Sequence, residues 1–197
     1  AEKLDPKNHE IKNLIGFTFM VRGDYENSEK YYKKAISVKK DYPEAHIGLA
    51  DVYIILKKWN NAIHHADEAL SNILYMSPYE AYNIRGWANF NNEDYNSAEV
   101  DFRNAISSNP NYVVAIYNLG LVYEKKGMYS PSSSQFLQAI DICSRCQSNF
   151  LSDLHFRAAE TLSAAGEKET ANEHYKKCWQ LNPKYLNAEK CRSKAEN

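Results

Sequence analysis

The sequence predicts an all-α fold, a solenoid of five helix-turn-helix repeats followed by one capping helix. Small residues recur at a nearly constant interval, because Gly16, Ala50, Gly86, Gly120 and Ala159 lie 34, 36, 34 and 39 residues apart. The composition agrees, since 7 glycines and 6 prolines against 15 tyrosines are typical of long helices joined by short turns. A repeat of this length indicates a stack of helix pairs, each burying its apolar surface against the next.

Each repeat carries two further small residues in register with the first. Twelve residues on, the chain has Ser28, Ala62, Ala98, Ser132 and Ala171, and nineteen residues on it has Ala35, Ala69, Ala105, Ala139 and Cys178. Between these two positions stand the aromatic residues Tyr32, Phe102, Phe136 and Tyr175, with Ala66 in the second repeat. Helices that cross closely need small side chains where they touch, and large side chains fill the space between successive pairs. The two helices of every repeat are therefore predicted to cross closely.

The repeat boundaries follow from this register and from the turn residues. Gly23, Gly127 and Gly166 lie where a first helix is expected to end, and Pro110 and Pro183 lie where a second helix stops. We place the repeats near residues 9–42, 43–78, 79–112, 113–151 and 152–185, with a polar cap over 186–197, in a single domain that spans 1–197. Extra residues near 71–77 and 143–151 predict a longer helix or a protruding loop.

These positions resemble the tetratricopeptide repeat family, and the copy over 79–112 is the most similar. The resemblance implies a right-handed α-α superhelix in which the first helix of every repeat lines a concave groove. The groove residues that it implies for binding a partner are Phe17, Met20, Ile47, Asp51, Ile54, Asn83, Ile84, Trp87, Phe90, Tyr117, Asn118, Leu121, Phe156 and Arg157.

Most of these groove residues are apolar, and a large exposed apolar patch usually marks a binding site for another protein. We therefore expect an apolar peptide or an amphipathic helix to lie in the groove. One alternative is that strong curvature, or the N-terminal segment Ala1–Asn8, covers part of it. The carboxylate clamp of chaperone-associated relatives is not expected, because only Asn118 and Arg157 match its set of Lys, Asn and Arg residues.

All four cysteines, Cys143, Cys146, Cys178 and Cys191, lie in the last third of the chain. Two disulfides that staple the C-terminal cap are predicted, with three possible connectivities. Such bonds indicate an oxidising compartment such as the periplasm. Two alternatives remain open. The cysteines are free buried thiols, or Cys143 and Cys146 form half of a zinc site, whose second half is missing because Cys178 and Cys191 lie 13 residues apart.

The charge and the motifs argue against several functions. With 24 basic and 25 acidic residues the formal net charge is -1, which provides no overall attraction to nucleic acid or to an anionic membrane surface. The chain has no HExxH pair, no GxSxG, no glycine-rich phosphate loop and no GxGxxG motif. The six histidines show no ligand spacing and are interpreted as solvated or satisfied side chains. We expect neither an enzyme nor a cofactor or metal site.

The sequence thus predicts a non-enzymatic scaffold for protein-protein interaction. A short solenoid with an apolar groove and C-terminal cysteines is also similar to the bacterial outer-membrane lipoproteins that act as pilotins for type IV pilus secretins. That similarity favours the periplasmic face of the outer membrane, with membrane attachment only through an N-terminal lipid anchor outside this sequence. The alternative is a cytoplasmic co-chaperone or regulatory adaptor.

Overall fold

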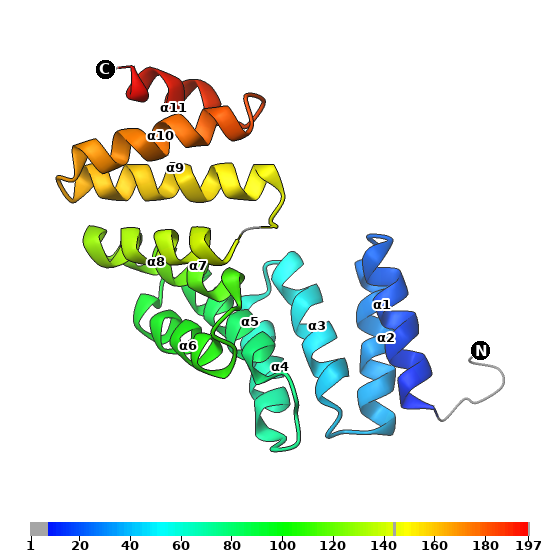
Figure 1. Ribbon diagram of the computed structural model, residues 1–197. Helices are drawn as coiled ribbons and strands as arrows, with labels where there is room; N and C mark the ends of the chain where they lie inside the picture. The colour runs from blue at the N-terminus through cyan, green and yellow to red at the C-terminus, as the bar shows by residue number, and fades with distance from the viewer. Residues whose placement is uncertain (1–7, 144, 197) are drawn as a thin grey trace. The chain divides into compact units, whose positions relative to one another are not determined.

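The computed structural model describes residues 8–143 and 145–196, and the regular elements in these residues are all α-helices (Figure 1). They form five sequential helix pairs and a C-terminal helix, as predicted. The helices are α1 (His9–Val21), α2 (Tyr25–Val38), α3 (Pro43–Ile55), α4 (Trp59–Ser71), α5 (Pro78–Asn91), α6 (Tyr95–Ser108), α7 (Val113–Lys125), α8 (Tyr129–Ile142), α9 (Ser148–Ala164), α10 (Lys168–Leu181) and α11 (Ala188–Ala195).

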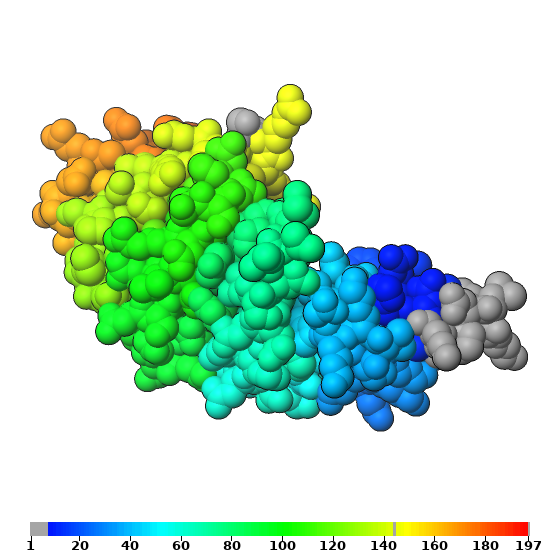
Figure 2. Space-filling view, turned by 90° about the horizontal axis from the view of Figure 1, so that it is seen from below, coloured from blue at the N-terminus to red at the C-terminus, as the bar shows by residue number. Residues whose placement is uncertain are grey.

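The helices divide into two compact units. Unit 1 contains α1 to α6 and ends at Asn109, and unit 2 starts at Pro110 and contains α7 to α11. In unit 1, the side chains of successive helices pack against one another in the space-filling view (Figure 2). None of the described helices has both the length and the hydropathy that a bilayer span requires.

The small residues of the repeat lie where an aromatic ring presses on the backbone of a neighbouring helix. A Cβ atom at Gly16 would lie 3.0 Å from Cδ1 of Tyr32, and one at Gly120 would lie 2.7 Å from Cε1 of Phe136. Both rings are fully buried. Serines at the next small position also donate a hydrogen bond across the helix pair, as Ser132 Oγ does to the Gly120 carbonyl oxygen at 2.8 Å. Their small size and their hydroxyl groups therefore both support the crossing.

The turn inside each helix pair requires a left-handed residue. Three repeats place glycine there, with φ angles of 77° at Gly23, 71° at Gly127 and 92° at Gly166. The other two place Lys57 and Glu93 there, with φ angles of 56° and 63°. Residues other than glycine adopt this backbone conformation at some cost in free energy. The predicted glycine position is thus a feature of the backbone that two repeats satisfy without glycine.

Both predicted insertions produce distinctive segments. The first forms the turn between α4 and α5, where the side chains of Ile73 and Met76 are 95% and 90% exposed. The second lengthens α9 to 17 residues, whereas the other paired helices have 13 or 14 residues. Residue 144 of this insertion lies outside the described residues. A longer helix was one of the two forms expected there.

Two disulfides lie near the C-terminus. Cys143 and Cys146 form one within the turn after α8, and Cys178 and Cys191 form the other, which joins α10 to α11. The second bond is the staple of the cap that the sequence suggested, whereas the first joins two neighbours in one turn. With these bonds formed, the four sulfur atoms are not thiolates that could bind zinc.

Candidate functional site

The inner face of unit 1 contains a hollow of about 320 Å³ between α1, α3 and α5, with the ring of Tyr32 from α2 also in its wall. Four of the predicted groove residues line it. We call this hollow the unit-1 groove, and its lining residues are Asn13, Leu14, Phe17, Met20, Tyr32, Glu44, Ile47, Gly48, Asp51 and Glu80.

The wall of the unit-1 groove that α1 forms is apolar and open to solvent. The side chains of Leu14 and Phe17 are 64% and 49% exposed, although both are large and hydrophobic. Ile47 is buried, and the Tyr32 ring lies against the backbone of Gly48. The groove therefore has a rigid inner surface of packed residues and an exposed apolar wall.

Three carboxylates lie in the same lining. Asp51 is half-buried, and burial is the main reason that its pKa is raised to about 6, with the negative charge of Glu80 as the second reason. Glu80 accepts a hydrogen bond from Tyr75 Oη at 3.3 Å, and the third carboxylate, Glu44, is exposed. None of the lysines and arginines in the described part of the chain lines the groove. The groove is therefore both apolar and acidic.

Further along α5, the predicted groove residues form an aromatic stack. The rings of Trp87 and Phe90 lie 5.4 Å apart and almost parallel, and Phe90 meets Tyr95 edge to face at 5.5 Å. Both stacked residues are half-buried, as are Ile54 and Asn83, while Ile84 is buried. The aromatic stack keeps part of its surface exposed, so it can extend the unit-1 groove along α5.

Two of the predicted groove residues of unit 2 bind carboxylates of the same unit. Tyr117 Oη donates to Asp153 Oδ2 at 2.6 Å, and Arg157 Nη1 pairs with Glu124 Oε2 at 3.1 Å. Burial, and then the hydrogen bond to Asp153, raise the pKa of Tyr117. Asn118 is buried and Leu121 half-buried. The Tyr117 hydroxyl and Arg157 Nη1 thus already have partners within unit 2, whereas the buried Arg157 Nε makes no hydrogen bond to the described residues.

Residues that follow α10 cover the predicted groove residue Phe156. The ring centroid of Tyr185 lies 6.5 Å from that of Phe156, and Lys190 Nζ lies 4.8 Å from the Phe156 centroid. Phe156 is only 8% exposed as a result. Tyr185 also donates a hydrogen bond to Asp153. This part of unit 2 therefore offers little apolar surface to a ligand.

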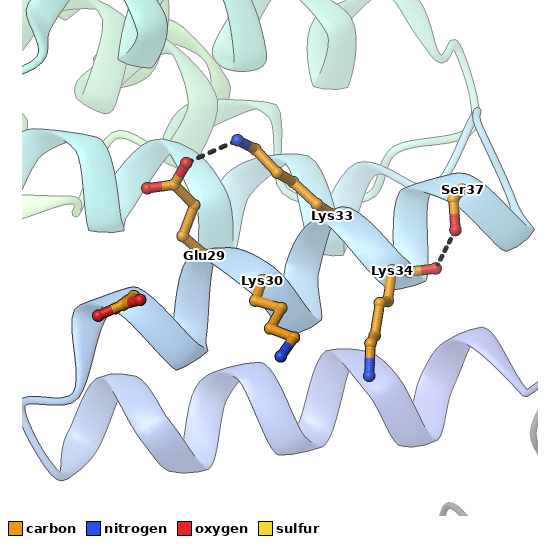
Figure 3. Close-up of a pocket in the computed structure, with 6 residues that line it drawn as sticks. Glu29, Lys30, Lys33, Lys34 and Ser37 are labelled. Atoms are coloured by element: carbon orange, nitrogen blue, oxygen red, sulfur yellow. Dashed lines mark hydrogen bonds and ion pairs between the residues drawn. The ribbon is translucent and has the colours of Figure 1, made fainter.

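A larger hollow of about 510 Å³ lies along α2, and it has a different character (Figure 3). Its lining residues all come from this one helix and are charged or polar. Lys33 Nζ pairs with Glu29 at 2.6 Å, and Ser37 Oγ donates to the Lys34 carbonyl oxygen at 2.8 Å. It is a solvated helix face, and it lacks the apolar wall of the unit-1 groove.

Four of the six histidines form two close pairs, which the sequence did not predict. His46 Nδ1 lies 3.0 Å from His65 Nδ1, and His155 Nδ1 lies 2.8 Å from His174 Nδ1. Burial, and then the partner histidine, lower the pKa of both His65 and His155 to about 4. The identical separation of 19 residues in two repeats is the signal that could have revealed them.

Comparison with known proteins agrees with this architecture. The sequence-family model of the tetratricopeptide repeat matches residues 9–42, 79–112 and 113–146, which together make up just over half of the chain. The first two of these ranges are repeats predicted above. Comparison with curated proteins gives no match.

Solved structures of similar fold include three that cover almost the whole chain. MamA is 25% identical with a TM-score of 0.74, covering 92% of this chain and 94% of its own. PilW, a type IV pilus biogenesis factor, is 17% identical with a TM-score of 0.86, covering 96% and 84%. YrrB, described as a protein with an unusual peptide-binding site, is 18% identical with a TM-score of 0.74, covering 98% and 96%.

Proposed function

This chain belongs to the tetratricopeptide repeat family and is a scaffold for protein-protein interaction, and from that premise we propose that it binds an apolar peptide or an amphipathic helix in the unit-1 groove. The observation that supports this most is the exposure of Leu14 and Phe17 beside a preformed hollow. Apolar walls around a rigid inner surface suit helix-in-groove recognition. The aromatic stack of Trp87 and Phe90 then provides a second set of contacts.

We also propose a narrower role, assistance to the assembly of a type IV pilus secretin at the periplasmic face of the outer membrane. Two features support it: the likeness in fold to PilW and a pair of disulfides, which persist in oxidising compartments. A cytoplasmic adaptor is the alternative. Mass spectrometry of the native protein, alkylated without reductant, distinguishes them, because four alkylated cysteines would contradict the periplasmic role.

Site-specific photo-crosslinking in the native host tests the groove. A photoreactive amino acid at position 14 is expected to capture one partner protein, because this side chain lies on the exposed apolar wall. The same group at Lys30, on the solvated face of α2, is the matched control (Figure 3). Phe17→Asp in the same chain should remove the crosslink while the circular dichroism spectrum stays unchanged. Equal crosslinking from positions 14 and 30 would contradict the proposed site.

A further inference from the structure

The polar atoms of the unit-1 groove are nearly all hydrogen-bond acceptors. The carboxylates of Glu44, Asp51 and Glu80 line it, and the buried side-chain oxygen of Asn13 receives no hydrogen bond from the described residues. The charged residues in the lining are all acidic. The Tyr75 hydroxyl is a donor, but it already bonds to Glu80. The described lining therefore provides no positive charge to balance its three carboxylates.

Asp51 illustrates the imbalance most clearly. Burial and the charge of Glu80 on α5 raise the pKa of Asp51, Asp51 in turn raises the pKa of Tyr32 on α2, and no cation of the described chain lowers the pKa of Asp51. A half-buried carboxylate next to a second carboxylate is unfavourable unless an opposite charge lies near both.

Unit 2 shows how the same position is satisfied within this chain. Glu160 stands one residue after Ala159, as Asp51 stands one residue after Ala50, so the two occupy the same position of their repeats. Lys190 Nζ lies 2.9 Å and Lys194 Nζ 2.8 Å from the Glu160 carboxylate, and both lysines belong to α11. A short basic helix thus neutralises this carboxylate in unit 2.

We propose that the segment bound in the unit-1 groove carries a lysine or arginine whose charged group lies between Asp51 and Glu80, flanked by apolar residues that contact Leu14 and Phe17. This inference rests on the proposed function of the groove. The aliphatic stem of either basic residue lies along the apolar wall while its head reaches the carboxylates. Charge-assisted hydrogen bonds are stronger than neutral ones, so they fix the register of the segment along the groove. The partner is therefore an amphipathic, basic segment of a protein.

A peptide display library tests this assignment on the full-length chain. The library contains 16-residue peptides with leucine or isoleucine at helical spacing and all residues allowed at the other positions. Selection on the wild-type chain is expected to enrich lysine or arginine at one fixed position of the binders. Selection on the Asp51→Asn, Glu80→Gln double variant should abolish that enrichment. Glu26→Gln, an exposed carboxylate on α2, is the matched control and should preserve it.

Affinities of one selected peptide make the test quantitative. Replacing its basic residue by glutamine should weaken binding to the wild-type chain by about tenfold, and replacing it by glutamate should weaken binding further. The glutamine change should have almost no effect on binding to the double variant. If peptides bind in a manner that Phe17→Asp abolishes, but show no preference for a basic residue, the inference is wrong and the proposed groove remains. If no peptide is enriched, both are wrong.

Discussion

The carboxylates at one repeat position have opposite surroundings in the two units. In unit 1, burial and then Glu80 raise the pKa of Asp51 to about 6. In unit 2, burial alone would raise the pKa of Glu160, but hydrogen bonds from Lys194, Tyr175 and Lys190 lower it to about 2. The difference comes from the helix two elements further along the chain. In unit 1, α5 places Glu80 near Asp51 of α3, whereas in unit 2, α11 places two lysines at Glu160 of α9.

The same repeat position can therefore serve two purposes within one chain. The Glu160 carboxylate stabilises the end of the chain, because its partners are built into the cap. The Asp51 carboxylate is half-buried beside Glu80, so we expect it to reduce the stability of unit 1, and proteins commonly retain such unfavourable groups where they bind something else. We therefore expect the two carboxylates to respond in opposite ways to mutation and to pH.

The largest expected effect comes from releasing the cap that supplies the lysines. Replacing Cys178 and Cys191 by alanine removes the bond between α10 and α11 and should lower the free energy of unfolding of unit 2 by about 3 kcal/mol. Hydrogen exchange followed by mass spectrometry should show faster exchange in α10 and α11. The bond between Cys143 and Cys146 closes a much shorter loop, so the Cys143→Ala, Cys146→Ala variant should lose less stability, about 2 kcal/mol. Unchanged exchange in α11 would show that the cap holds without its disulfide.

Acidification should affect the two units alike, because each contains a histidine pair. The pKa of His155 falls to about 4 through burial, then through the charges of His174 and Lys177, and Glu173 partly offsets the effect at His174. A folded state that resists protonation loses stability as the pH falls below 6.5, and the loss is complete near pH 4. We expect about 2 kcal/mol from this pair by urea unfolding.

His155→Phe separates this contribution from the other titrating groups. It should flatten the stability of unit 2 between pH 6.5 and pH 4, because a phenyl ring fills the buried site without a proton to bind. The pair of His46 and His65 in unit 1 remains as an internal control, and exchange in α3 and α4 should keep its acid response. If the pH profile of α9 is unchanged in the variant, the histidine pair is not the cause.

Glu160→Gln should destabilise unit 2 by about 1–2 kcal/mol at pH 7, a figure reduced for solvent screening because the side chain is 29% exposed. The pKa of Glu160 is lower in the folded state, so its contribution is present above about pH 4.5 and is lost as the pH falls toward 2. Urea unfolding at pH 7 measures the difference. Lys190→Gln, Lys194→Gln should have a similar effect, and a stabilised variant would contradict the comparison.

The sequence predicts the helix pairs well because their crossing depends on local residue size. Gly16 and Gly120 leave room for the rings of Tyr32 and Phe136, which the same register places opposite them. The repeat also predicts which helix faces inward. It predicts exposure poorly, since Ile47 and Ile84 occupy groove positions and yet are buried by their neighbours.

Contacts between distant segments could not be predicted from the repeat. Tyr185 is the last residue of the fifth repeat and Lys190 lies in the cap beyond it, and both contact Phe156, while Tyr185 also donates to Asp153. The Tyr32 ring was expected only as packing, yet it also lines the unit-1 groove. Periodicity gives the position of a residue within its own helix pair, whereas these contacts depend on three-dimensional packing between pairs.

The smallest expected effect has the opposite sign. Asp51→Asn should stabilise unit 1 by about 1 kcal/mol at pH 7, because the neutral amide avoids both the burial of charge and the repulsion from Glu80. The folded state raises the pKa of Asp51 from 3.8 to about 6, so its unfavourable contribution grows as the pH rises through this range. The gain should therefore be largest above pH 6 and absent near pH 4, as measured by urea unfolding at both values.

A variant that gains stability at pH 7 but loses affinity for basic peptides would show that the wild-type chain keeps this carboxylate for binding. A loss of stability at pH 7 would mean that Asp51 already has a favourable partner inside the folded chain.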